Sequence, residues 1–204
     1  IYYLVGPSRQ AIENGPYLEA FKARSLEVLF CFEPIDDFVF SNLMQFKEKK
    51  LVSADSDEVK LDDSVSNEGE PLGEEELKSL CEWLKTTFGD EKVTEVAAGN
   101  RLVGSPAIAL NEDSGMTANM RRMMKAMNPD GAGGMDMPEK VKLQVNPRHN
   151  LIKNLAAQKD TDPDTAKLVA EQVLDNALVA AGLLEDPRSM LQRIHALLEK
   201  VSNK

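Results

Sequence analysis

Two amphipathic helices near the C-terminus constrain this chain more than any other feature, because each has a broad apolar stripe that needs a cover. Asp162 and Pro163 predict the start of a helix that runs to Gly182. Asp186 and Pro187 predict the start of the next one after a short turn. The first stripe consists of Val169, Val173, Leu174, Ala177, Leu178 and Ala181. The second consists of Met190, Leu191, Ile194, Leu197, Leu198 and Val201.

The two helices predict an antiparallel hairpin over residues 163–203, and its stripes can be covered in two ways. A second copy of the chain can supply the cover, which gives a symmetric four-helix bundle and a homodimer. Alternatively, the hairpin folds back onto the strands and helices that precede it. The apolar pattern alone favours neither arrangement. The interface residues in the dimer hypothesis are Val173, Leu174, Ala177, Leu178, Leu191, Ile194, Leu197 and Leu198.

Residues 1–54 alternate between strand-like and helix-like segments. The expected strands lie at 1–5, 27–32 and 49–54, and the expected helices at 7–15, 16–24 and 34–46. EVLFCF at 27–32 is apolar throughout, as expected for a strand covered on both faces. The order strand-helix-strand-helix-strand predicts a small α/β unit with parallel pairing.

Residues 55–73 predict a mobile acidic linker or a boundary loop, because seven acids against one lysine leave little apolar surface to offset ordering. Residues 74–204 then form a second domain. Its expected elements before the hairpin are a helix at 74–88, strands at 92–98, 106–110 and 141–145, and a helix within 146–158. The predicted fold class is therefore a small α/β unit followed by a mixed α+β domain that ends in the helical hairpin.

Composition and motifs argue against several classes of function. A net charge of −10 disfavours binding to nucleic acid or to an anionic membrane, both of which need concentrated Lys and Arg. His149 and His195 have no Cys or His at metal-ligand spacing. Cys31 and Cys81 are expected as reduced thiols, and the glycines at 131–134 match no nucleotide-binding fingerprint. We therefore predict no catalytic, metal or cofactor site.

Residues 115–128 contain five of the nine methionines in the chain. These are Met116, Met120, Met123, Met124 and Met127. On a helix, with about 100° between residues, all five share one arc of about 100°. An ordinary core face explains such a stripe and is favoured from the pattern alone. Methionine in place of leucine also suits an adaptable surface that accepts many partners.

Seven motifs in one order resemble the heat-shock protein 90 chaperone family. They are IYYLVGPSR, EVLFCFEPIDDF, KKLVSAD, NRLVGSPAI, MTANMRRMMKA, VNPRHNLIK and LVAAGLLEDPRSML. The resemblance covers nearly the whole chain. It implies a segment that runs from the end of the family's middle domain (residues 1–54) through its C-terminal dimerisation domain (residues 74–204).

The resemblance implies part of an ATP-driven homodimeric clamp that remodels partly folded client proteins. The family's client-facing helix matches Met116, Met120, Met123 and Met124, and Met127 stays unassigned. Phe38 matches an aromatic position in the same cleft, and residues 163–203 match the helices of the dimer interface. ATP and Mg would bind the longer protein upstream of Ile1. This chain itself would then have no cofactor and no ATPase activity.

The ends of the chain add further expectations. Its start within a strand suggests a segment of a longer protein. Its end, EKVSNK, lacks the tail that recruits tetratricopeptide co-chaperones in cytosolic eukaryotic members, so no such partner is expected. LFCFEP, NPRH and AAGLLEDPR look closest to the mitochondrial form. We therefore expect the mitochondrial matrix, with the bacterial cytoplasm as the alternative, and we assign no role to the Gly-rich residues 130–138.

Two rival functions remain at this point. In one, the chain is a purely structural dimerisation module, and its methionines are buried. In the other, it is a small enzyme domain that binds a ligand at the carboxyl ends of the strands in the first α/β unit. The enzyme hypothesis is weakened by the missing catalytic constellation.

Overall fold

The structure is a computed structural model that describes residues 1–61, 69–110, 140–184 and 186–202. The first part contains β1 (Tyr2–Val5), α1 (Arg9–Asn14), η1 (Pro16–Leu18), α2 (Glu19–Ala23), β2 (Val28–Cys31), α3 (Pro34–Leu43), β3 (Gln45–Phe46), β4 (Lys49–Lys50) and β5 (Val52–Ser53). The second contains α4 (Glu74–Phe88), β6 (Val93–Ala98), β7 (Ala107–Leu110), β8 (Val141–Val145), α6 (Asn150–Thr161), α7 (Pro163–Ala181), η2 (Pro187–Met190) and α8 (Leu191–Ser202).

The first sheet has the strand order β2-β1-β5, and both pairings are parallel. This confirms the α/β unit predicted for the first segment. The expectation that β2 is covered on both faces is wrong, because Leu29 at its centre is 51% exposed. The reason is topological: β2 is the outer strand of the three, and β1 takes the middle position.

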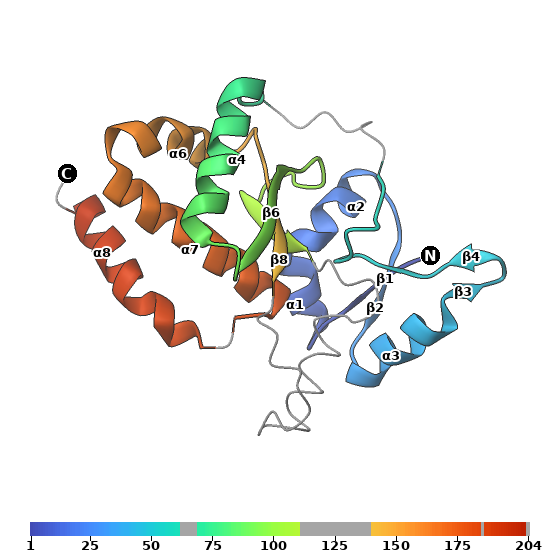
Figure 1. The fold of residues 1–204 in the computed structure, drawn as a ribbon. Helices are drawn as coiled ribbons and strands as arrows, with labels where there is room; N and C mark the ends of the chain where they lie inside the picture. The colour runs from blue at the N-terminus through green and yellow to red at the C-terminus, as the bar shows by residue number, and fades with distance from the viewer. Residues whose placement is uncertain (62–68, 111–139, 185, 203–204) are drawn as a thin grey trace.

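The second sheet is mixed, with β8 between a parallel β6 and an antiparallel β7. Helix α4 packs on β6 and α7 packs on β7, while α6 packs along α7. Their apolar side chains form one core together with the sheet. The predicted mixed α+β character of residues 74–204 is therefore confirmed for the described residues (Figure 1).

The helix ends follow the capping signals in the sequence. The Asp162 side chain accepts a hydrogen bond from the backbone N–H of Thr165, and Pro163 occupies the first turn of α7. Gly182 ends this helix with φ = 67°, a left-handed conformation that suits a residue without Cβ. Likewise, the Ser8 hydroxyl accepts from the N–H of Ala11 at the start of α1.

The two parts of the molecule share a second core. Leu4, Ile12 and Phe21 of the first part pack with Ile108 and Leu110 of β7. The end of the first part belongs to the same cluster, since Ala54 and Val59 are buried in it. The prediction of a mobile linker is therefore wrong for residues 55–61, while residues 62–68 lie outside the described part.

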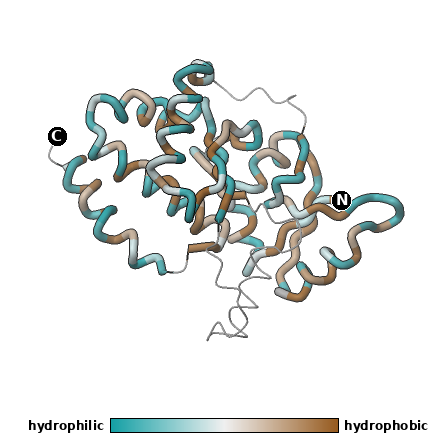
Figure 2. The backbone as a smooth tube through the Cα atoms, viewed as in Figure 1, coloured by the Kyte–Doolittle hydropathy of each residue, from teal (hydrophilic) through white to brown (hydrophobic). Residues whose placement is uncertain are grey.

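The two ends of the molecule differ in character. Figure 1 shows α3 and the β3–β4 hairpin on one side, and α8 on the opposite side, with the two sheets between them. In the tube coloured by hydropathy, α3 carries a large share of hydrophobic residues, although none of its residues belongs to either core cluster (Figure 2). Among the described helices, none has the length and apolar character that crossing a membrane requires.

Candidate functional site

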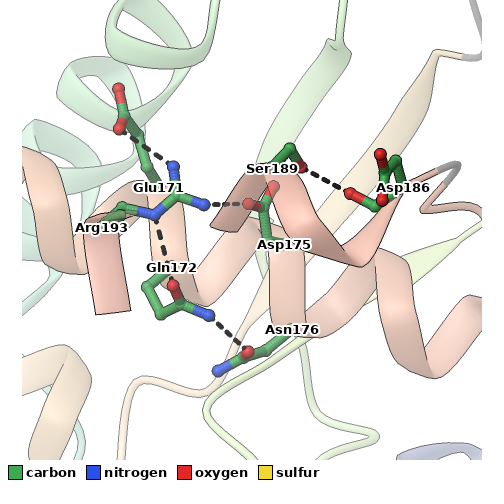
Figure 3. Close-up of polar contacts among 7 residues, drawn as sticks. All are labelled: Glu171, Gln172, Asp175, Asn176, Asp186, Ser189 and Arg193. Carbon is green, nitrogen blue, oxygen red and sulfur yellow. Dashed lines mark hydrogen bonds and ion pairs between the residues drawn. The ribbon is translucent and has the colours of Figure 1, made fainter. Parts of the chain in front are cut away.

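Helix α8 is fixed to α7 by a cluster of polar side chains around Arg193. The Arg193 guanidinium forms an ion pair with Asp175 and another with Glu171, at 3.3 Å between Nη1 and Oε2. Its Nε also donates to the side-chain oxygen of Gln172 at 3.3 Å (Figure 3). Gln172 in turn donates to Asn176 one turn further along α7. A single planar cation thus binds three successive polar groups on one face of α7.

The start of α8 is ordered by its own turn. The Asp186 carboxylate accepts from the backbone N–H of Arg188 at 3.0 Å and from its guanidinium at 2.8 Å. Hydrogen bonding by Arg188 lowers the pKa of the Asp186 carboxyl below its ordinary value. The Ser189 hydroxyl donates to the carbonyl oxygen of Asp186 at 2.7 Å, which closes the turn (Figure 3).

The apolar residues of α8 lie in two environments. Ile194 and Leu197, about 100° and 40° around the helix from Arg193, are half-buried, whereas Leu191, Leu198 and Val201 are exposed. None of the twelve residues of α8, all of them described, is buried against the described part of the chain. At about 100° per residue, Leu191 and Leu198 lie about 160° and 140° around the helix from Arg193. Leu198 is 59% exposed, and Val201 on the same flank is 72% exposed. Arg193 therefore directs α8 so that Leu191 and Leu198 point outward.

The residues predicted on α7 have a different environment. Val173, Leu174 and Ala177 are buried in the chain's own core, where α7 packs on β7. The predicted dimer interface is corrected at these three positions, because side chains that already fill the core cannot also contact a second copy. The hairpin folds back with α7, as in the alternative arrangement, and leaves α8 on the outside. Leu178 is half-buried at the edge of the same core.

The other predicted site residue in the described part, Phe38, lies on α3. This helix begins with a capping box, in which the Glu33 side chain accepts from the N–H of Asp36 and the Asp36 side chain accepts from the N–H of Glu33. Phe40 stacks on Tyr3 of β1 with ring centroids 4.9 Å apart, which fixes one face of the helix. Phe38 is 50% exposed on another face.

The exposed apolar surface around Phe38, called the α3 surface below, is larger than the sequence indicated. It also includes Ile35, Val39, Leu43, Met44 and Phe46, all of them large and exposed. The helix expected over 34–46 ends at Leu43, and Met44 turns the chain with φ = 54°. Lys47 and Glu48 then take positive φ values, which close the β3–β4 hairpin. Lys-Glu is not a typical sequence for this turn, so no local signal predicted the hairpin.

The remaining predicted site residues lie outside the described part. Met116, Met120, Met123, Met124 and Met127 all fall within residues 111–139. The Gly-rich residues 130–138 fall there too.

The titratable side chains of the described residues form no obvious chemical site. Within the part of the chain that the structure describes, no group of three His, Cys, Asp or Glu side chains could hold a metal ion. Burial raises the pKa of both the Cys31 and Cys81 thiols to about 11, which keeps them protonated and unreactive near neutral pH. His149 caps α6, since its Nδ1 accepts from the N–H of Leu151 at 3.0 Å.

Known proteins that resemble the chain place it in one family. The family described as "Hsp90 protein" matches residues 1–203. The chain belongs to the Hsp90 family. It is 45% identical over 202 residues to "Chaperone protein HtpG" of Desulfitobacterium hafniense, covering 98% of this chain and 32% of that protein. It is 37% identical over 208 residues to "Heat shock protein 75 kDa, mitochondrial" of Rattus norvegicus, covering 98% and 29%.

The family match confirms the resemblance to the Hsp90 family that the seven motifs indicated, and the bacterial relative is named as a chaperone. The chain spans about a third of the length of the relatives it matches. Which third of an Hsp90 protein it corresponds to is therefore a proposal. Bacterial and mitochondrial relatives match at 45% and 37% identity, so the three motifs that look mitochondrial do not single out that form.

Proposed function

We propose that the chain is the part of an Hsp90-type chaperone that joins two protomers and presents an apolar surface to partly folded clients. It would comprise the end of the middle domain and the C-terminal dimerisation domain. The observation that carries this proposal is the outward apolar stripe of α8, held in place by Arg193 on the opposite side of the helix.

Several features support an interface between two copies. Leu191, Leu198 and Val201 form one flank of α8 and are exposed in the single chain. Val179 on the neighbouring helix α7 is exposed as well. An amphipathic helix whose Leu191 and Leu198 are exposed gains roughly 25 cal/mol per Å² when a second copy covers these side chains. A two-fold arrangement that places the α7–α8 hairpins together supplies this cover symmetrically.

The dimer is tested by the mass of the chain in solution, with and without residues 187–204. The intact chain should sediment as a dimer, and the shortened chain as a monomer. If the shortened chain still forms a dimer, another surface joins the protomers and the assignment to α8 is wrong.

The client surface would combine α3, the β3–β4 hairpin and the methionines at 116–124. Phe38 and Met44 are exposed without any role in the described cores, which supports a surface that gains contact only when a partner binds. Aromatic and methionine side chains cover apolar area on differently shaped partners. Binding should be weak, because each client also loses conformational entropy.

A pair of matched variants tests this surface. Phe38→Ser should weaken the binding of a partly folded test client roughly tenfold, through the apolar area lost from the contact. Leu151→Ser removes a similar exposed side chain from α6 and should leave client binding unchanged. Equal binding by both variants and the parent would exclude α3 from the client surface.

Limited oxidation tests the methionines themselves. Met116 and Met120 should oxidise readily in the native dimer and become protected when a client is bound. Resistance of both residues in the absence of client would favour the rival hypothesis, in which the chain is a structural dimerisation module with buried methionines.

ATP and Mg would bind elsewhere in the longer protein, so this chain alone would not hydrolyse ATP. The start of a helix is a common phosphate site, but α3, α4 and α7 begin with carboxylates that repel phosphate. Calorimetry of the chain with ATP and Mg should detect no binding. A saturable heat would instead place the family's nucleotide site within this chain.

The compartment is proposed as the mitochondrial matrix, with the bacterial cytoplasm as the alternative. The relative from Rattus norvegicus carries "mitochondrial" in its name, and the relative from Desulfitobacterium hafniense is bacterial, which supports carrying both settings. Fractionation of cells that produce the full-length protein distinguishes them.

A further inference from the structure

Strand β7 connects the two cores of the molecule. All four of its residues are buried: Ala107 and Ala109 face the core with α7, while Ile108 and Leu110 face the core with the first α/β part. Any displacement of the first part therefore has to move β7 or open the core beside it. Helix α7 packs on β7 and is joined to α8. The position of β7 therefore affects how the α3 surface is oriented relative to the proposed dimer helix.

The loop in front of β7 is bound by a single carboxylate from the first part. The Glu19 Oε2 atom accepts from three consecutive backbone N–H groups, those of Val103 at 2.8 Å, Gly104 at 2.9 Å and Ser105 at 3.1 Å. The other carboxylate oxygen accepts from the Ser105 hydroxyl. Glu19 is the first residue of α2, more than eighty positions earlier in the sequence. Hydrogen bonds to a charged acceptor are stronger than neutral ones.

Two other polar contacts across the same boundary are buried. The Tyr17 hydroxyl donates to the Ala109 carbonyl of β7 at 2.6 Å, and its burial raises the pKa of this phenol. The Arg101 guanidinium donates to the Ala54 and Ser56 carbonyls at 2.5 and 2.8 Å. Both contacts lie inside the packed core, so breaking them exposes buried polar groups. The Glu19 contact instead lies at the edge, beside the exposed Val103.

We propose that Glu19 is a positioning residue that sets the orientation of the α3 surface relative to α8. Its carboxylate fixes the loop at 102–105, and the loop fixes β7 against the first part of the chain. Because this contact lies at the solvent-exposed edge, it can open without unfolding either core. The functional meaning rests on the proposed function, but the geometric claim stands without it.

Hydrogen exchange of the 204-residue chain tests the contact directly. Glu19→Leu removes both acceptor oxygens and should speed exchange at the Val103, Gly104 and Ser105 amides by about tenfold or more. The amide of Leu143 in β8 should be unchanged, which shows that the fold persists. Unchanged exchange at the three loop amides would overturn the proposal.

Three further variants separate positioning from general damage. Glu19→Gln keeps one acceptor oxygen and should retain part of the protection, as a rescue by the conservative change. Glu27→Leu makes the same substitution at an exposed carboxylate outside the contact and should behave like the parent. Gly104→Ala keeps its N–H, and the added Cβ would lie 3.8 Å from Glu19 Oε1, so the contact should survive.

Distances between spin labels test the orientation. Labels on β4 at Lys49 and on α6 at Asn154, in a background without Cys31 and Cys81, should give one narrow distance distribution in the parent and in the Glu27 control. Glu19→Leu should broaden it. An excess of unlabelled chain keeps the measured pairs within one protomer.

An equally narrow distribution for Glu19→Leu would show that the cores alone fix the orientation, and would overturn the inference. A monomeric mass of the parent chain would instead refute the proposed dimer and leave the Glu19 result standing.

Discussion

Helices α7 and α8 form one hairpin, yet they use their apolar residues in opposite ways. In α7, the side chains of Ala166, Ala170 and Leu174 are buried against the sheet and neighbouring helices. In α8, none of the residues, all of them described, is buried against the described part of the chain. One helix completes the core of its own chain, and the other is attached to it by Arg193 and presents Leu191 and Leu198 outward.

The difference shows how equal sequence patterns can have unequal roles. Both helices have an apolar stripe wide enough for a core or for an interface. The small alanines of α7 allow close approach to β7, whereas α8 packs mainly against α7 and the short helix η2 that precedes it. Helix α7 therefore adopts the folded-back arrangement considered from the sequence, and the exposed side of α8 is where we propose the contact with a second copy.

The largest effect on the free energy of unfolding is expected from a substitution at Leu174. It is 3% exposed in the core, so Leu174→Ala should lower the free energy of unfolding by about 2–5 kcal/mol through lost burial and a cavity. Leu198→Ala in α8 should change it by less than about 0.5 kcal/mol at protein concentrations too low for association. Urea denaturation measures both, and equal losses would show that the two helices are buried alike.

The next effect concerns the connection between the helices. Arg193→Met removes the cation from between Asp175 and Glu171 and should cost about 1–3 kcal/mol of unfolding free energy. Arg193→Lys keeps the charge but not the planar fork, so it should recover only a part. If Arg193→Met leaves the urea midpoint and the α8 amide exchange unchanged, apolar contacts alone attach α8.

A third test uses the Cys81 thiol, which packs against the same core as α7. Burial raises its pKa from the ordinary 9.0 to about 11, so at pH 8 it should alkylate about a hundredfold more slowly than in the unfolded chain. The folded state favours the protonated thiol, and this stabilisation is present below pH 9 and is lost as the pH rises towards 11. Mass spectrometry follows the reaction.

The same thiol sharpens the comparison between the helices. Leu174→Ala should accelerate alkylation of Cys81, because it loosens the core. Leu198→Asp should not, because α8 lies outside that core. Acceleration by both variants would mean that α8 also closes the core around α4.

Local sequence signals predicted most elements but few of their contacts. Asp162, Pro163 and Gly182 located α7, because caps and turns act within a few residues. The β3–β4 hairpin was missed, since Lys47 and Glu48 adopt left-handed conformations that their side chains do not favour. The hydrogen bonds between Glu19 and the loop at 102–105 leave no periodic pattern in the sequence, because they depend on how β7 packs between two cores.

Family membership was predictable because the seven motifs recur in order, and it identified Phe38 on a surface that is exposed. The division of the dimer residues was not predictable. The apolar pattern of α7 is the same whether the helix packs against β7 or against another chain. Only the packed structure shows that Val173 and Ala177 are already buried in the core.

If two copies join through the outward side of α8, sedimentation equilibrium of the chain will show it. The parent should then sediment with twice the chain mass of 22.5 kDa. Leu198→Asp should sediment with the single mass, with the same urea midpoint for the isolated protomer. A parent chain that sediments with the single mass at concentrations of about 100 μM, far above the dissociation constant expected for a stable dimer, would contradict the proposed dimer.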